Sequence, residues 1–96
     1  MHHNSMDKTK EISQEVEQYF RDSKMSYQVI RILQRSIRPD DSHVCIVVAK
    51  KEDKEEYAYW TCWNRLTKCL NHGFHGYTDF EKCLNEAKGH IYLVEE

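Results

Sequence analysis

The sequence predicts an α+β domain: an antiparallel sheet of three strands, with a fourth left open, packed by two helices in the order α-β-β-β-α(-β). The prediction rests on three observations: an amphipathic segment over residues 7–22, two apolar segments over residues 43–50 and 57–63, and a helix-capping sequence at Thr78. A chain of 96 residues has room for about one domain with one modest core. We therefore expect a single small domain over residues 7–96, preceded by six residues that are disordered or left from cloning.

The first helix is predicted over Asp7–Asp22. Its apolar residues are spaced at i, i+4, i+7 and i+8 in an otherwise polar segment, namely Ile12, Val16, Tyr19 and Phe20. This stripe is narrow, so the helix needs a sheet or a partner to pack against.

The next segment, Tyr27–Ile37, fits two structures. As a helix it would place Val29, Ile30, Leu33 and Ile37 on one face, whereas as a strand it would place Ile30 and Ile32 opposite Val29 and Leu33. Its β-branched residues and the turn-forming sequence at Pro39–Ser42 favour the strand. We choose the strand and leave the helix as the alternative.

The centre of the sheet is predicted from two neighbouring segments. His43–Lys50 is a short apolar run typical of a strand buried on both faces. Tyr57–Trp63 alternates large residues on both faces, with Trp60 and Trp63 on opposite sides. The charged residues 51–56 between them predict a solvated turn and hence an antiparallel hairpin. After a second turn at residues 64–67, residues 68–73 form a weaker strand.

A second helix is predicted over Asp79–Lys88. Thr78 and Glu81 have the spacing of a capping box, and Gly89 is placed to end the helix. The apolar face comprises Phe80, Cys83, Leu84 and Ala87. His90–Val94 then fits an optional edge strand.

Composition excludes several classes of function. The chain lacks an apolar run of about 18 residues, and no secretory signal is visible at its start, so we expect a cytoplasmic protein with reduced cysteines and no membrane association. It also lacks the phosphate-binding, nucleophile-elbow and zinc-protease motifs. We expect no catalysis and no cofactor.

The aromatic residues favour a protein-binding module. Six tyrosines and two tryptophans exceed what a small core easily buries, so part of this aromatic area should be exposed. We predict that the sheet face binds a protein partner or a second copy in a homodimer. The predicted contact residues are Trp60, Trp63, Phe74 and Tyr77.

Nucleic-acid binding is the first alternative. Residues 24–51 carry six Lys or Arg against two Asp, and the basic residues near the central aromatics are Arg31, Arg35, Arg38, Arg65 and Lys68. The element order resembles that of double-stranded RNA-binding domains. The second helix, however, begins with acidic Asp79 and Glu81 where that family has lysines, so the resemblance does not identify a member.

Zinc binding is the second alternative. Cys69, His72 and His75 have suitable ligand types in a C-x2-H-x2-H spacing. In a strand, His72 would face away from the other two residues, so the three converge only if Gly73 and Gly76 bend the chain.

Overall fold

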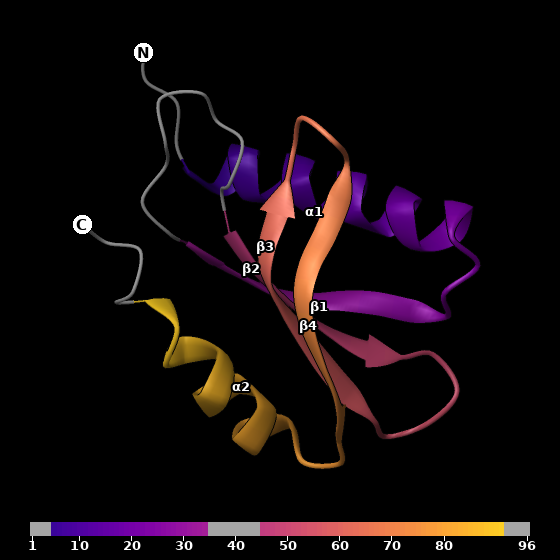
Figure 1. Ribbon diagram of the computed structural model, residues 1–96, viewed down its shortest axis with the longest axis vertical. Helices are drawn as coiled ribbons and strands as arrows, with labels where there is room; N and C mark the ends of the chain where they lie inside the picture. The colour runs from indigo at the N-terminus through magenta and orange to yellow at the C-terminus, as the bar shows by residue number, and fades with distance from the viewer. Residues whose placement is uncertain (1–4, 35–44, 92–96) are drawn as a thin grey trace.

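The computed structural model describes residues 5–34 and 45–91, and it confirms the predicted fold class. A four-stranded antiparallel sheet has strand order β1-β2-β3-β4, and the two helices lie at opposite ends of the chain (Figure 1). The elements are α1 (Ser5–Asp22), β1 (Tyr27–Gln34), β2 (Cys45–Lys51), β3 (Tyr57–Asn64), β4 (Cys69–Tyr77) and α2 (Phe80–Lys88).

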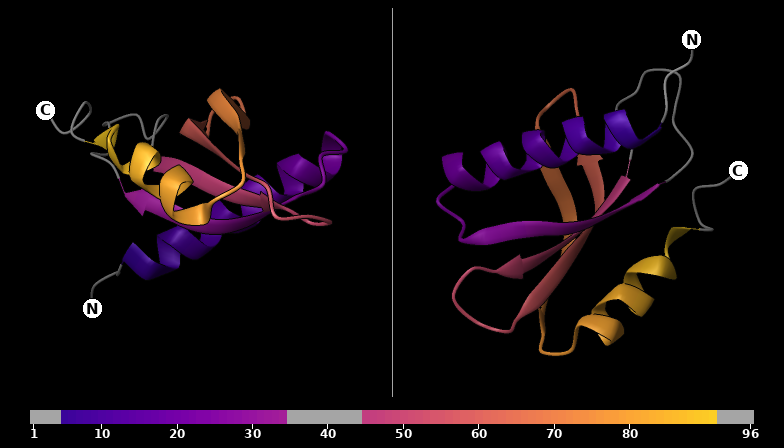
Figure 2. Two further views of the ribbon diagram at one scale, coloured as in Figure 1. Left: turned by 90° about the horizontal axis from the view of Figure 1, so that it is seen from below. Right: turned by 180° about the vertical axis from the view of Figure 1, so that it is seen from behind.

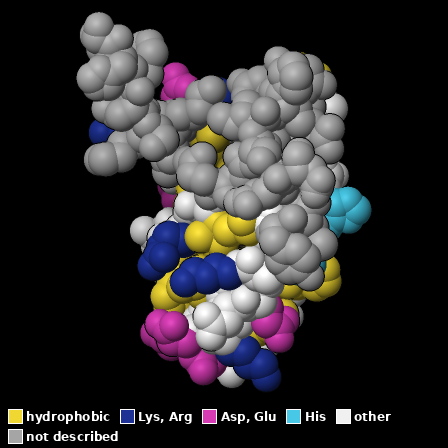
Figure 3. Space-filling view, turned by 90° about the vertical axis from the view of Figure 1, so that its left-hand side faces the viewer, with side chains coloured by type: hydrophobic (Ala, Val, Ile, Leu, Met, Phe, Trp, Pro, Cys, Tyr) yellow, Lys and Arg dark blue, Asp and Glu magenta, His cyan; other side chains and the backbone are white. Residues whose placement is uncertain are grey.

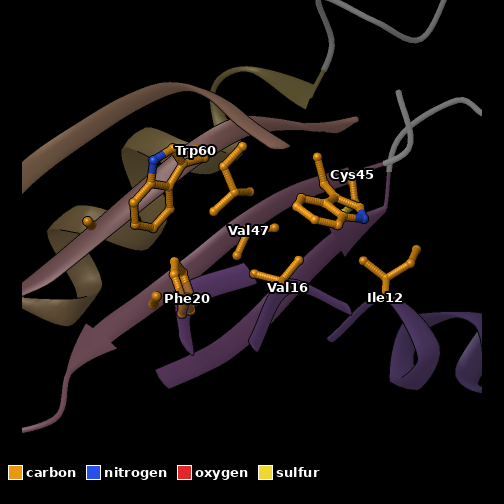
Figure 4. Packing of buried hydrophobic residues seen from close by; sticks show 10 residues of the cluster. Ile12, Val16, Phe20, Cys45, Val47 and Trp60 are labelled. Atoms are coloured by element: carbon orange, nitrogen blue, oxygen red, sulfur yellow. The ribbon is translucent and has the colours of Figure 1, made fainter. Parts of the chain in front are cut away.

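The two helices pack on opposite faces of the sheet (Figure 2). Alternate residues of β2 explain this, since Val47 and Ala49 face α1 whereas Ile46 and Val48 face α2. All four are fully buried, as the apolar run predicted. The α1 side is the larger core, and Val16 and Phe20 of α1 pack there against Val47 and Trp60 (Figure 4).

Strand β1 confirms the strand interpretation over Tyr27–Gln34, but its predicted faces were wrong. A register shift between Val29 and Arg31 marks a β-bulge, which leaves Ile30 exposed. Because the bulge adds one residue, Val29 and Ile32 both pack on the α1 side. Residues 35–37 of the predicted strand lie outside the described residues.

Strand β3 also departs from simple alternation. Trp60 and Trp63 both pack in the α1-side core, whereas regular alternation predicted opposite faces. Strand β4 shifts in the same way, since Leu70 belongs to this core and a Cβ on Gly73 would meet the Trp60 indole. His72, between these two β4 residues, has a φ of 59°, a conformation that is rare inside a strand.

Strand β4 extends to Tyr77 rather than ending at the predicted Gly73. Gly76 has a φ of 90° at a second register shift, which only glycine adopts without strain. The turn before β4 is fixed by Asn64, whose Oδ1 accepts hydrogen bonds from the backbone N–H groups of Leu66 and Thr67 at 3.0 and 3.1 Å.

Helix α2 is capped one residue later than the capping box predicted. The Asp79 carboxylate, rather than the Thr78 hydroxyl, accepts the hydrogen bond from the Glu81 N–H at 3.1 Å. Gly89 ends the helix in a right-handed conformation. His90 lies in a turn and Ile91 has 3₁₀-helical conformation, so neither starts the predicted edge strand, and residues 92–94 lie outside the described ranges.

Candidate contact surface on strand β4

Strand β4 forms one edge of the sheet and pairs with β3. Its residues 72–76 are exposed, and none of its nine residues, CLNHGFHGY, carries a carboxylate, an ammonium or a guanidinium group. Folded proteins commonly protect an open strand edge with charged side chains, because its main-chain N–H and C=O groups can pair with another strand. The β4 edge lacks that protection.

Phe74 lies at the centre of this exposed run. Its side chain is 41% exposed, although its ring stacks on Tyr59 with a centroid distance of 4.9 Å and an interplanar angle of 22°. His90 stacks on the same ring at 5.7 Å, and its Nε2 lies 3.2 Å from the Tyr59 hydroxyl oxygen. Phe74 is therefore held in place by two rings while it presents apolar area to solvent. We call the group Tyr59, Phe74, Tyr77 and His90 the Phe74 cluster.

Tyr77 connects this cluster to α2. Its hydroxyl donates a hydrogen bond of 2.6 Å to the Glu86 carboxylate. This bond, together with partial burial, raises the pKa of Tyr77 well above its ordinary value, so the phenol keeps its proton at neutral pH. The tyrosine fixes the end of β4 against the helix rather than providing a titrating group.

The opposite side of β4 carries a second aromatic group. The His75 ring meets the Trp60 indole edge-on at 5.3 Å, and His75 Nδ1 lies 3.3 Å from the Tyr27 hydroxyl oxygen. Trp60 is only 5% exposed. It leans over Gly73, where a Cβ would lie 2.5 Å from the indole Nε1. Glycine at position 73 is thus required for this packing.

The structure separates the four predicted contact residues. Phe74 and Tyr77 lie together in the Phe74 cluster, whereas Trp60 and Trp63 are buried in the α1-side core. We therefore base a contact surface on Phe74 and Tyr77 only. Sequence reasoning missed Tyr59 and His90, because the contact of Tyr59 with Phe74 depends on the register of β3 and β4, and that of His90 depends on the path of the chain after α2.

The predicted nucleic-acid residues do not form one surface. Arg65 binds the Glu15 carboxylate through Nε at 3.1 Å and through Nη2 at 2.5 Å, and Lys68 Nζ lies 4.0 Å from the same carboxylate. Arg31 lies over the Phe80 ring on the α2 side of the sheet. Arg35 and Arg38 fall outside the described residues. Of the predicted residues that the structure describes, Arg31 thus lies on a different face from Arg65 and Lys68, and the Glu15 carboxylate offsets the charge of the latter two.

Glu15 also accepts a hydrogen bond of 3.0 Å from Trp63 Nε1. Burial alone would raise the pKa of the Glu15 carboxyl, but the hydrogen bonds from Arg65 and Trp63 and the charges of Arg65 and Lys68 outweigh it and hold the pKa below its ordinary value. Glu15 is therefore ionised at neutral pH.

The predicted zinc ligands are not assembled. In residues 5–34 and 45–91, no group of three or more His, Cys, Asp or Glu side chains could hold a metal ion. Cys69 lies beside Tyr19 and its thiol points to the Leu70 carbonyl at 3.8 Å, whereas His75 contacts Tyr27 and Trp60. No disulfide joins the four cysteines, all of which are described. We do not retain the zinc alternative.

A pocket of about 480 Å³ lies between α1 and the start of β4. Its polar groups already have partners within the protein: Glu15 binds Arg65 and Trp63, and Gln18 donates to Asp22 at 2.8 Å. It therefore offers no converging set of free polar groups to orient a small ligand.

Hydrophobic side chains also reach the surface on the side of the molecule that carries α2, where Lys, Arg, Asp and Glu lie around them (Figure 3). None of the helices among the described residues is both long and apolar enough to cross a membrane. The structure thus defines a small α+β domain with an exposed aromatic side chain, Phe74, at one edge of its sheet.

The chain belongs to the family described as Large polyvalent protein associated domain 24, whose model matches residues 11–81. This match covers the segment from the first turns of α1 to the start of α2. Comparison with curated proteins gave no match, and comparison with solved structures gave none either.

Proposed function

We propose that the domain is a non-catalytic module that binds protein through the Phe74 cluster and the adjoining β4 edge. The observation that carries this proposal is the state of Phe74, an aromatic side chain that is 41% exposed yet fixed by stacking on Tyr59 and His90. A rigid aromatic side chain loses little conformational entropy on binding, which is why such residues dominate the energetics of protein interfaces.

The chemistry of the thiols supports a non-catalytic role. Burial, followed by the charge of Glu86, raises the pKa of the Cys83 thiol to about 11, so the reactive thiolate is scarce at neutral pH. Cys45 and Cys62 are also buried, 0% and 5% exposed, so solvent has little access to their thiols. These residues suit a core rather than a reaction.

Site-specific photocrosslinking tests the proposal. Benzoylphenylalanine replaces Phe74 in the whole chain, and the matched control places it at Leu66, which is 71% exposed in the turn before β4. After irradiation in the expressing cells, we expect protein adducts from position 74 and few from position 66. Adducts that disappear with nuclease would instead support nucleic-acid binding. The absence of a protein adduct at position 74 would overturn the proposed function.

A further inference from the structure

The two edges of the sheet differ in how they are protected. At the β1 edge, the Val29 N–H donates a hydrogen bond of 2.9 Å to the Glu17 carboxylate of α1, and Arg31 adds a charge. The β4 edge has neither a charged residue nor a described side chain bound to its exposed main chain. An exposed edge without charged side chains can accept an additional strand over its regular residues.

The exposed run of β4 is complementary to itself. Its sequence over residues 72–76 is His-Gly-Phe-His-Gly. If a second copy pairs antiparallel with a two-fold axis at Phe74, then Gly73 faces His75 and Phe74 faces Phe74 of the second copy, over the three residues between His72 and Gly76, whose φ angles of 59° and 90° are not extended. His75 of each copy then lies opposite the small Gly73 of the other, and the two phenylalanine rings meet as an aromatic cross-strand pair.

The charge pattern also favours a second copy. Antiparallel pairing about a two-fold axis brings every residue near itself or near its neighbours, so a charged strand would place like charges together. Nearly a third of the chain is charged, yet Cys69–Tyr77 has no charged residue. Two copies of β4 can therefore pair without placing like charges next to each other.

We propose that two copies of the chain pair edge to edge through β4, antiparallel, with Phe74 opposite Phe74 of the second copy. This inference rests on the proposed function, for which it names the partner and the binding mode. The paired strands form one continuous eight-stranded sheet.

Oppositely charged variants at position 74 test the register. In light scattering on a size-exclusion column, we expect wild-type dimer, and we expect Phe74→Glu and Phe74→Lys each to raise the dimer dissociation constant at least ~10-fold through like-charge repulsion and loss of the aromatic pair. An equimolar mixture of the two should restore the dimer, because Glu then faces Lys. Leu66→Glu, an exposed position outside β4, is the matched control and should stay dimeric.

Disulfide trapping provides a test that does not depend on the charged variants. Residues facing each other in antiparallel strands have Cα atoms about 4.5–5.5 Å apart, which suits a disulfide. In a Cys69→Ser background, Phe74→Cys should form a covalent dimer under mild oxidation, whereas Leu66→Cys should not. Equal trapping at both positions, or charged variants whose mixture stays monomeric, would overturn the register.

Failure of this inference can be separated from failure of the proposed function. If the wild-type chain is monomeric at all concentrations while benzoylphenylalanine at position 74 still crosslinks to a different protein, the second copy is wrong but the protein-binding surface stands. If no protein adduct forms at position 74 either, both proposals fall.

Discussion

Truncation of Glu15 should destabilise the domain more than loss of its charge alone. In Glu15→Ala, the indole N–H of the fully buried Trp63 loses its acceptor, a loss that costs about 1–3 kcal/mol, and the partly buried Arg65 guanidinium loses its bidentate partner. Water reaches Arg65, whose side chain is 18% exposed, which limits the second loss. We expect the free energy of unfolding to fall by about 2–3 kcal/mol in total.

The variant Glu15→Gln removes the negative charge but keeps an acceptor for the hydrogen bond from Trp63. The amide oxygen can still accept from Trp63, while the charge that attracts Arg65 and Lys68 is gone, so we expect a loss of about 1 kcal/mol. Urea unfolding followed by tryptophan fluorescence measures both variants. Glu11→Ala is the matched control, because this 64% exposed carboxylate lies 3.5 Å from the same guanidinium and should contribute less than about 0.5 kcal/mol.

The pH dependence provides the test of the charge. The pKa of Glu15 is lower in the folded state than its ordinary value of 4.5, so its ionised form stabilises the fold fully above that pH. This contribution is lost as the pH falls through the folded pKa. The difference in unfolding free energy between wild type and Glu15→Gln should therefore shrink below pH 4.5. A difference that stays constant from pH 7 to about pH 3, or a Glu15→Ala variant no less stable than Glu15→Gln, would refute the reasoning.

Two further variants test local features of the fold. Asp79→Ala should lower the free energy of unfolding by about 1 kcal/mol in urea titrations, because it removes the N-cap of α2, whereas Thr78→Ala should cost less than about 0.5 kcal/mol; the reverse order would restore the capping box. Gly73→Ala should cost about 1–3 kcal/mol and alter tryptophan fluorescence, because its Cβ would lie 2.5 Å from Trp60 Nε1. Unchanged stability and emission would contradict the packing of Trp60 on β4.

Much of the fold could be predicted because the strongest patterns are local. The apolar stripe of α1 and the valine-rich run of β2 each identified an element, since burial of one helix face leaves a periodic pattern and burial of both strand faces leaves a continuous apolar run. The antiparallel pairing of β2 with β3 followed from the short charged turn between them. These features need no knowledge of distant contacts.

The face of the sheet on which each side chain of β1 and β3 lies could not be predicted in the same way. A bulge at Ile30 reverses the faces of β1, and the irregular backbone at His72 accompanies the shift that brings Trp60 and Trp63 to one side. Both features depend on pairing with a neighbouring strand, which a single segment does not reveal. The prediction of the contact surface was affected most, because the placement of Trp60 and Trp63 in it rested on regular alternation.

The high content of tyrosine and tryptophan is explained by the two cores of the domain, one on each face of the sheet. A helix on each face gives the sheet two cores, so Trp60 and Trp63 are buried on the α1 side while Tyr59 is buried on the α2 side. Tyrosine and tryptophan content alone was thus a poor measure of exposed surface.

The same architecture limits where a partner can bind. Helices occupy both faces of the sheet, and α1 protects the β1 edge through the hydrogen bond from the Val29 N–H to Glu17. Of the sheet in the described residues, β4 then presents the exposed main chain, and it does so beside Phe74, a ring already fixed by its neighbours. An edge that offers main-chain pairing and a preorganised aromatic anchor at one place suits binding by strand addition better than binding by a flat face.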